Sequence, residues 1–375
     1  MALKSESDHA KSADGRGLCL VSSGVDTLNC SARGKVSEAF VQSLDVLRNG
    51  ANDRREVVSC FPSDGEGFIL KPHGVRGYPY WLSSGGIDLK VGAAEPFPPV
   101  LVEVRSWLLH ESGVVAALNR VHRRLEADVF SGRSEVLPSR VDLQADIQGW
   151  EPAQRDLERF VCRAKHRGIY QPEAELHAYG NQLSGFAFGR GDVHGRVYNK
   201  SLEQQVSGDT GASLYWAGAN LDAPVWRIEY QFRREALVGM GVGDMPALLA
   251  NLQGLWHYGM GWLSLRERTA HRKRSRWPED PTWTWLRSVE IGEPSNPLIR
   301  SRLRRANLDR VVRGLAGNLS SLAALQGTDE LGWALRRAHP LVQRYVEERG
   351  ESFSRIASRK RARFEALLGP TVEYE

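Results

Sequence analysis

The sequence predicts an α+β domain around an antiparallel sheet, followed by a mostly helical, basic C-terminal part. Three observations support this prediction. Residues 56–105 alternate short apolar runs with glycine and proline breaks, which is typical of an antiparallel meander. Segments with apolar residues at helical spacing interrupt the strands. From about Asp244 onward, helical periodicity dominates the rest of the chain.

The expected elements follow in order from the N-terminus. Residues 1–20 are rich in Ser, Asp, Lys and Gly, and we expect a disordered leader there. A strand is expected over 24–31, and a helix over 35–49 ends before Gly50. The next elements are a helix over 113–128, a strand over 139–147, a helix over 152–167, short strands between about 175 and 200, and a strand over 225–233.

The change of character near Asp244 predicts three parts. They are the leader (1–20), an α+β domain (21–240) and a helical, Arg- and Trp-rich region (241–375). We place the domain boundary between about 236 and 300.

Composition narrows the class of protein. With 41% hydrophobic and 25% charged residues, the chain has the balance of a globular protein. No stretch approaches the ~20 apolar residues of a membrane span, and the N-terminus lacks the apolar core of a secretory signal. Its four cysteines are scattered without metal-ligand spacing. We therefore expect neither a disulfide framework nor structural zinc, and a cytoplasmic location.

Positive charge is unevenly placed. The net charge is only +5, but residues 266–276 hold six cations and one acid, and the tail from Leu298 holds fifteen Lys/Arg against nine Asp/Glu. This density indicates a polyanion partner, although Arg-rich helices can also be solvated faces.

Polar residues alternate along three of the expected strands. Residues two apart in a strand share a face. The three polar faces hold Asp142, Gln144 and Asp146; Arg196, Tyr198 and Lys200; and Arg227, Glu229, Gln231 and Arg233. If the strands lie side by side, these faces form one surface with a tyrosine, carboxylates and cations.

This surface has the groups needed for phosphoryl transfer. Tyr198 would be the nucleophile, and because its hydroxyl has a pKa near ~10, a nearby cation or metal has to activate it. Arg196 or Lys200 would offset charge on the phosphate oxygens. Hard oxygen ligands suit Mg²⁺ or Mn²⁺. The alternative is that each polar face is merely solvated and that Glu229 forms a cross-strand ion pair.

The ordered segments SRVDLQAD (139–146), GRVYNKSLE (195–203) and VWRIEYQFRRE (225–235), preceded by GVDTL (24–28), resemble the replication initiation factor family. This family includes Rep_trans-type rolling-circle replication initiators of plasmids, phage initiators, and MobT-type relaxases of integrative conjugative elements. The resemblance covers roughly residues 22–290.

The resemblance implies an HUH-related fold, with a central antiparallel sheet flanked by helices, and site-specific nicking of one DNA strand at an origin. Tyr198 would form the 5′-phosphotyrosyl link, and Arg196 and Lys200 would contact phosphate. Asp142, Glu229 and, as a further candidate, Asp146 would hold the metal. Asp142 and Asp146 lie roughly 13 Å apart along a regular strand, so both cannot ligate one ion; we favour Asp142.

The chain also departs from related nickases. It lacks a His-hydrophobe-His pair, and no helix-turn-helix precedes the first strand. Origin recognition would then fall to the sheet domain or to the basic C-terminal part. A non-nicking relative that has lost its metal site is the alternative.

Basic and aromatic residues of the C-terminal part suit DNA. We expect Arg272, Lys273, Arg274 and Arg276, together with Arg227 on the sheet, to contact DNA. Trp283 and Trp285 either stack on unpaired bases or fill an apolar seam between domains. The basic amphipathic segments at 300–313 and 355–363 suit duplex DNA or a partner such as a host helicase.

The resemblance to the replication initiation factor family also implies that the protein forms a homodimer.

Three functions remain to be compared. The first is a nicking initiator or relaxase, and the second is a non-catalytic DNA-binding regulator of a plasmid, phage or integrative element. The third, a tyrosine recombinase, ranks low because the late Tyr345 and Tyr374 lack the Arg and His-x-x-Arg set that such an enzyme needs. For nicking, we expect Tyr198 and Glu229 on adjacent strands with outward side chains, and Asp142 within metal-bridging reach of Glu229.

Overall fold

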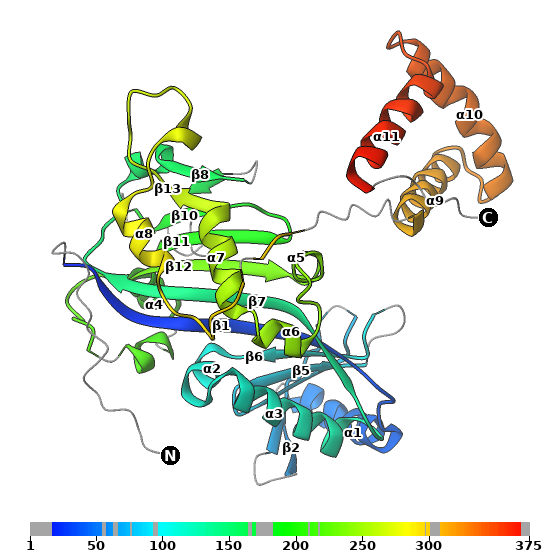
Figure 1. Cartoon of the computed structure of the whole chain (residues 1–375). Helices are drawn as coiled ribbons and strands as arrows, with labels where there is room; N and C mark the ends of the chain where they lie inside the picture. Colours follow the sequence, from blue (N-terminus) through cyan, green and yellow to red (C-terminus); the bar gives the residue numbers. More distant parts are fainter. Residues whose placement is uncertain are drawn as a thin grey trace. The chain divides into compact units, whose positions relative to one another are not determined.

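The computed structural model describes residues 17–54, 58–62, 67–75, 77–92, 97–163, 167–169, 183–208, 211–216, 218–296, 298–300 and 308–368. These residues form an eleven-stranded sheet in the order β2-β3-β4-β5-β6-β1-β7-β12-β11-β10-β9, and all neighbouring strands are antiparallel. The predicted α+β class, with an antiparallel sheet flanked by helices and a helical C-terminal part, is confirmed (Figure 1).

The strands of the large sheet are β1 (Cys19–Arg33), β2 (Val58–Pro62), β3 (Gly67–Leu70), β4 (Tyr80–Ser84), β5 (Ile87–Val91), β6 (Val100–Val104), β7 (Glu135–Gln148), β9 (Arg167–Ile169), β10 (Gly185–Phe188), β11 (Val193–Asn199) and β12 (Trp226–Arg233). A separate two-stranded sheet joins β8 (Phe160–Cys162) to β13 (Leu263–Leu265).

The helices up to residue 300 are α1 (Glu38–Arg54), α2 (Ser106–Ser112), α3 (Val114–Arg124), α4 (Lys200–Ser207), α5 (Arg234–Gly239), α6 (Met245–Leu249), α7 (Leu252–Trp262) and α8 (Pro281–Arg287). Short turns of other helical types are η1 (Leu125–Val129), η2 (Gln154–Glu158), η4 (Gly211–Tyr215) and η5 (Arg274–Arg276).

The two long strands β1 and β7 pair along most of their length at the centre of the sheet. Their pairing is interrupted between Val25 and Thr27, so that Asp26 is an extra residue in β1. Such a bulge breaks the two-residue alternation and redirects the side chain at that point. The position of Asp26 therefore cannot be read from the alternation of its neighbours.

One face of the sheet is apolar and packs against α7. Tyr230 meets the Trp256 ring edge-on at 5.4 Å between ring centroids, and Phe232 meets Tyr258 at 6.2 Å. A side chain at Gly259 would clash with the Tyr230 ring, 2.6 Å from where its Cβ would lie. The glycine therefore lets the helix approach the sheet closely, and α7 belongs to the same core as the strands.

Three of the expected elements differ from the structure. The helix expected over 35–49 does not end before Gly50, since α1 continues to Arg54. The helix expected over 152–167 is wrong: this stretch forms η2 and β8, because Phe160 is buried among Phe186, Phe188 and Trp283 while β8 pairs with β13. The strand expected at 196–200 ends at Asn199, and Lys200 begins α4. The expected strands between about 175 and 182 and the leader up to residue 16 lie outside the described residues. The strand β1 begins at Cys19, within the range expected for the leader (1–20).

The chain divides into two compact units, residues 1–300 and 301–375. This division lies at the upper end of the range predicted for the boundary (236–300), and not at 240/241, where the predicted parts were separated. The reason is that apolar residues of α6, α7 and α8, such as Leu248, Trp256 and Trp283, are buried in the same core as the sheet. Residues 241–300 are therefore part of the first unit.

The second unit is helical, as predicted for the end of the chain. It comprises α9 (Leu308–Leu325), α10 (Leu331–Glu347) and α11 (Phe353–Leu368). Its small core contains Leu319, Ala323 and Ala334. Throughout the part of the chain that the structure describes, no helix is long and apolar enough to cross a membrane.

Candidate functional site

Strand register brings the predicted site residues together on one face of the sheet. Across β11, β12 and β7, Tyr198 lies opposite Arg227, and Arg227 lies opposite Asp146. Two residues before Tyr198 on β11, Arg196 lies opposite Glu229 on β12. The three polar faces therefore form one contiguous surface, as expected if the strands were neighbours.

Tyr198 is bound directly to Glu229. The Tyr198 hydroxyl donates a hydrogen bond of 3.0 Å to Oε2 of Glu229, and Arg196 forms an ion pair with Oε1 of the same carboxylate. Arg196 also lies 3.5 Å from Oδ2 of Asp142, and Nε of Arg140 donates to Oδ1 of the same carboxylate at 2.8 Å. A tyrosine, two carboxylates and two arginines thus form one connected group.

This group is more buried than the sequence suggested. The expectation of outward, solvated polar faces is wrong: Tyr198 is 4% exposed, and Asp142, Asp146 and Glu229 are all buried. Such burial is tolerated because each carboxylate is paired with an arginine. The partly exposed side chains are those of Arg140 and Arg196, which leave a cationic edge beside the buried tyrosine.

Burial changes the chemistry of the ionisable groups. It raises the pKa of Tyr198 above its ordinary value, although the charges of Arg227 and Arg196 oppose this. Burial likewise raises the pKa of Asp142, while Arg140 and Arg196 oppose the rise. Tyr198 is therefore a neutral phenol at neutral pH, and any nucleophilic role requires a proton acceptor such as the bound Glu229.

Lys200 lies at the edge of this group rather than on the strand. It is the first residue of α4, whose N-terminus is capped by the Asn199 side chain accepting from the Leu202 amide. Its Nζ binds Glu203 at 2.6 Å and lies 5.9 Å from the Tyr198 ring centroid. Lys200 is thus placed near Tyr198, with Glu203 as its ion-pair partner.

Arg227 organises a second group on the same face. Its Nε donates to Asp146 at 2.6 Å, its Nη2 donates to Asp146 at 2.8 Å, and its Nη1 donates to Asp26 at 2.6 Å. The Trp216 indole donates to Asp146 at 2.7 Å. Arg227 was predicted as a DNA contact, but its side chain is 1% exposed and engaged by carboxylates. This arrangement suits a buried structural cation rather than a surface contact.

Sequence reasoning missed the residues that cover this second group. They are Asp26, Ser106, His110, Tyr215 and Trp216. Asp26 lies in a bulge, so alternation along β1 did not mark it. Tyr215 and Trp216 lie in and after η4, just beyond a Gly- and Ser-rich stretch that resembles a plain loop. The one available signal was Asp26, the acid within the GVDTL segment.

The predicted metal ligands do not fit a divalent ion in this arrangement. Arg196 contacts both Asp142 and Glu229, so a guanidinium group holds the carboxylates that a metal would bridge. Asp146 is held by Arg227 and Trp216. Within the described ranges, no group of three His, Cys, Asp or Glu residues could hold a metal ion.

The predicted basic segment is an exposed loop between β13 and α8. Arg272, Lys273, Arg274 and Arg276 are all exposed. The Trp277 indole donates to the His271 carbonyl at 2.6 Å, and a bridge between Arg266 and Glu279 closes the base of the loop. The loop thus presents cations on an ordered backbone, as suits a phosphate contact.

The two tryptophans after this loop differ from each other. Trp283 is fully buried, and its indole donates to the Leu263 carbonyl at 2.9 Å. It fills the core, so the alternative in which it stacks on bases is wrong for Trp283. Trp285 is only partly buried against the same core.

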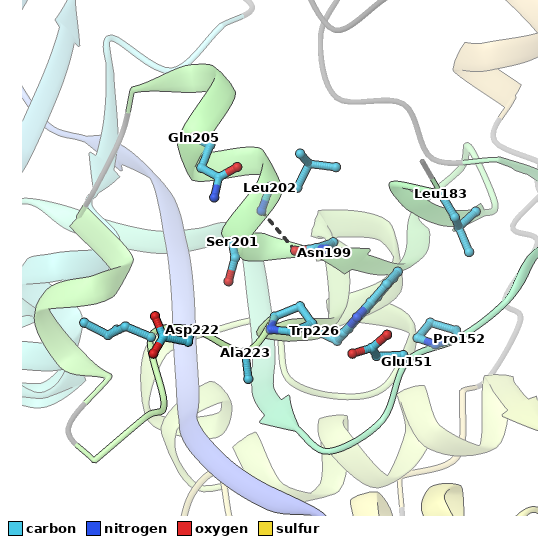
Figure 2. Close-up of a pocket in the computed structure, with 12 residues that line it drawn as sticks. Glu151, Pro152, Leu183, Asn199, Ser201, Leu202, Gln205, Asp222, Ala223 and Trp226 are labelled. Carbon is cyan, nitrogen blue, oxygen red and sulfur yellow. Dashed lines mark hydrogen bonds between the residues drawn. The ribbon is translucent and has the colours of Figure 1, made fainter. Parts of the chain in front are cut away.

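A pocket of about 370 Å³ lies beside the ends of β11 and β12. Figure 2 shows Asn199, Ser201 and Gln205 on one side of it, facing Trp226 and Glu151. Asn199 and Trp226 neighbour Tyr198 and Arg227 along their strands, so they point to the opposite face. Among the described residues that line it are two carboxylates, Glu151 and Asp222, and no Lys or Arg, which disfavours phosphate binding there.

The fold and site together define an α+β protein whose antiparallel sheet carries a tyrosine–carboxylate–arginine group on one face. No protein-family model matches the chain, and no curated protein matches it. Among solved structures, the chain is similar to a rolling circle replication initiator protein from Geobacillus stearothermophilus. The identity is 18%, the match covers 72% of this chain and 96% of that chain, and the TM-score is 0.42.

Proposed function

We propose that this protein is a replication initiator or relaxase that nicks one DNA strand at an origin through Tyr198. The observation that carries the proposal is the 3.0 Å hydrogen bond from the Tyr198 hydroxyl to Glu229, whose other oxygen is held by Arg196. A tyrosine bound to an oriented carboxylate beside cations has the arrangement of an activated nucleophile.

In the proposed step, Oη of Tyr198 bonds to the phosphorus and the bond from phosphorus to the 3′ oxygen breaks. Glu229 accepts the phenol proton, and the departing 3′ oxygen takes up a proton to become a hydroxyl. Arg196 and Lys200 stabilise charge on the non-bridging phosphate oxygens. The product is a 5′-phosphotyrosyl link, which a 3′ hydroxyl can later attack to rejoin the strand.

The rival proposal is a DNA-binding regulator without chemistry. Two observations favour it: Tyr198 is 4% exposed, and burial raises the pKa of its hydroxyl. The basic loop at 272–276 would then serve DNA binding alone. Nicking requires the DNA phosphate to reach Tyr198 past the partly exposed Arg196 and Arg140.

A covalent-adduct assay separates the two proposals. The full chain is incubated with candidate origin strands and with a randomised single-stranded DNA library, and denaturing gels detect any adduct. Peptide mapping then finds the modified residue. An adduct at Tyr198 supports nicking. Tight DNA binding without an adduct on any strand would favour the regulator.

We retain Mg²⁺ or Mn²⁺ as a proposed cofactor that would help to polarise and position the phosphate. Adduct formation is expected with either ion and is expected to stop when EDTA removes it. Because arginines hold the carboxylates here, metal binding would need Asp142 and Glu229 to leave Arg196. An unchanged adduct yield in EDTA would remove metal from the proposal.

The basic loop is expected to supply part of the DNA affinity. Replacing Arg272, Lys273, Arg274 and Arg276 together by alanine should weaken single-strand binding and reduce the slope of log affinity against log salt by about 3, at about 0.7 for each phosphate that the protein no longer neutralises. Titrations at several salt concentrations measure this slope. The control replaces the exposed Arg123 and Arg133, which lie outside the loop. Because the control removes two cations and the loop variant removes four, equal reductions of affinity per cation removed would show a non-specific charge effect.

We propose that the second unit mediates contact with a second copy of the chain. On α9, Val311, Leu315, Leu322 and Leu325 recur at intervals of four, seven and three residues, which is the spacing of a coiled-coil seam. Val311 is 61% exposed and Leu315 is 52% exposed. A host helicase is the other partner that such an apolar helix would suit.

Light scattering after gel filtration tests the homodimer. The wild-type chain is expected to give a dimer mass, and Leu315→Glu is expected to give a monomer because the charge lies within the seam. Leu221→Glu, at an exposed leucine of the first unit, is the control. A monomeric wild type at every concentration would contradict the proposal and leave α9 to a different partner.

A further inference from the structure

Tyr215 is connected to a carboxylate through a serine hydroxyl. Oη of Tyr215 lies 2.8 Å from Oγ of Ser106, and Ser106 donates to Oδ1 of Asp26 at 3.1 Å. Because Ser106 gives its proton to Asp26, it accepts from Tyr215. The three residues come from η4, the start of α2 and the bulge of β1, so the tertiary fold assembles this chain of hydrogen bonds.

Arg227 completes the surroundings of the Tyr215 hydroxyl. Its Nη2 donates to Oη of Tyr215 at 3.3 Å, and its Nη1 donates to Asp26 at 2.6 Å. A guanidinium donor at the phenol oxygen stabilises negative charge there. The Tyr215 ring stacks on His110 with 3.8 Å between centroids and 14° between planes, which holds the ring in place.

The electrostatics of this group keep the Asp26 carboxylate ionised, which is the form that can accept a proton. Burial alone would raise the pKa of Asp26, but the charges of Arg227 and Lys200 and the Ser106 hydrogen bond outweigh it, so the pKa lies below its usual value. Asp26 is therefore ionised at neutral pH. Burial raises the pKa of Tyr215, and Arg227 opposes this rise.

Tyr215 is also more accessible than Tyr198, since it is half-buried while Tyr198 is buried. Both phenols interact with the same Arg227. The face of the sheet therefore carries two tyrosines, each hydrogen-bonded toward a different carboxylate: Glu229 for Tyr198 and Asp26 for Tyr215.

We infer that Tyr215 is a second hydroxyl that attacks a DNA phosphodiester, with Ser106 and Asp26 as the route for its proton. The inference rests on the proposed nicking function. In this step Oη of Tyr215 bonds to phosphorus and the bond to the 3′ oxygen breaks. The phenol proton passes to Ser106 as the Ser106 proton passes to Asp26, and the 3′ oxygen takes up a proton. One chain could then hold two DNA ends at once.

A purely structural role makes a different prediction. In that case the Tyr215 hydroxyl only links η4 to α2 through its hydrogen bond to Ser106. Its removal then changes the stability of the fold but not the formation of DNA adducts. The distinguishing observation is therefore an adduct on residue 215 itself, which no structural role produces.

The test maps adducts on the full chain after incubation with candidate origin strands and the randomised single-stranded DNA library in Mg²⁺ or Mn²⁺. In Tyr198→Phe, the remaining adduct is expected on Tyr215, and Tyr198→Phe with Tyr215→Phe is expected to give none. Wild-type adduct on Tyr198, with none on Tyr215 in either protein, would overturn the inference and leave the proposed function standing. No adduct in the wild type would overturn both.

Ser106 tests the proton route as a positioning residue. Ser106→Ala in the Tyr198→Phe background is expected to slow adduct formation at Tyr215 by about 10²-fold or more without changing DNA affinity. Ser106→Thr, which keeps a hydroxyl, is expected to restore the rate. The control is Tyr78→Phe, since the Tyr78 hydroxyl donates to the Pro98 carbonyl away from this group. A Ser106→Ala rate equal to the Ser106→Thr rate would remove Ser106 from the route.

Discussion

Replacing Tyr198 by phenylalanine is expected to abolish the DNA adduct at residue 198 and to lower total adduct at least about tenfold. The substitution removes one oxygen atom from a ring that is otherwise packed in place, so the sheet should persist. The hydroxyl donates to a buried carboxylate, and hydrogen bonds to charged groups contribute about 1.5–3 kcal/mol. Chemical denaturation is expected to show a free energy of unfolding that is lower by this amount. The adduct at residue 198 is expected to disappear in the same variant.

Tyr80→Phe is the matched control for this variant. The Tyr80 hydroxyl donates to Asp45 at 2.7 Å, and Tyr80 is as buried as Tyr198, but it lies on β4. The control should lose stability and keep its adduct. If Tyr198→Phe nicks as fast as the wild type, the role assigned to Tyr198 is wrong, however well the variant folds.

The sequence could predict which side chains share a face, because strand alternation is a local property. Asp142 and Asp146 on β7, Glu229 on β12 and Tyr198 on β11 all point the same way, as their spacing indicated. The antiparallel arrangement followed from the short apolar runs and their glycine and proline breaks.

Burial of that face could not be predicted in the same way. It depends on residues distant in sequence: Trp216 reaches Asp146 across 70 positions, and Tyr215 reaches Ser106 across 109. Without those partners, Asp146 and Arg227 look like solvated surface residues. Asp26 was missed for another reason, since a bulge changes which face a residue occupies and leaves no pattern in a single strand.

The separation of the predicted parts at 240/241 was misplaced for a related reason. Helical periodicity in 244–262 marks a change in secondary structure, and a change in secondary structure is not a change of domain. The apolar side of α7 packs on the sheet through Trp256 and Gly259, which only the three-dimensional arrangement reveals.

Replacing Arg227 by methionine is expected to lower the free energy of unfolding by about 3–5 kcal/mol, because it leaves two carboxylates without their cation. The guanidinium binds Asp146 through two nitrogens and Asp26 through a third, and the side chain is almost completely buried. Methionine fills much of the same volume, so the decrease reports mainly on charge. Urea denaturation at neutral pH measures it, with the exposed Arg123→Met as control.

The pH dependence of this decrease follows from Asp26. In the wild type its pKa is lowered on folding, so it stabilises the fold above the unfolded pKa near 3.8, and this contribution disappears as the pH falls through the folded pKa. Without Arg227, burial dominates and raises the pKa, so the variant loses stability as the pH rises. The difference between the two proteins should therefore be largest at neutral pH and should narrow toward pH 4.

A second substitution separates the buried charge from simple packing. Adding Asp146→Asn to Arg227→Met removes one of the stranded carboxylates, so the double variant is expected to recover part of the stability. If packing alone mattered, the second change would bring no recovery. An Arg227→Met protein within about 1 kcal/mol of the wild type would mean that Asp146 and Asp26 find other partners, and that Arg227 is free to serve DNA as the sequence first indicated.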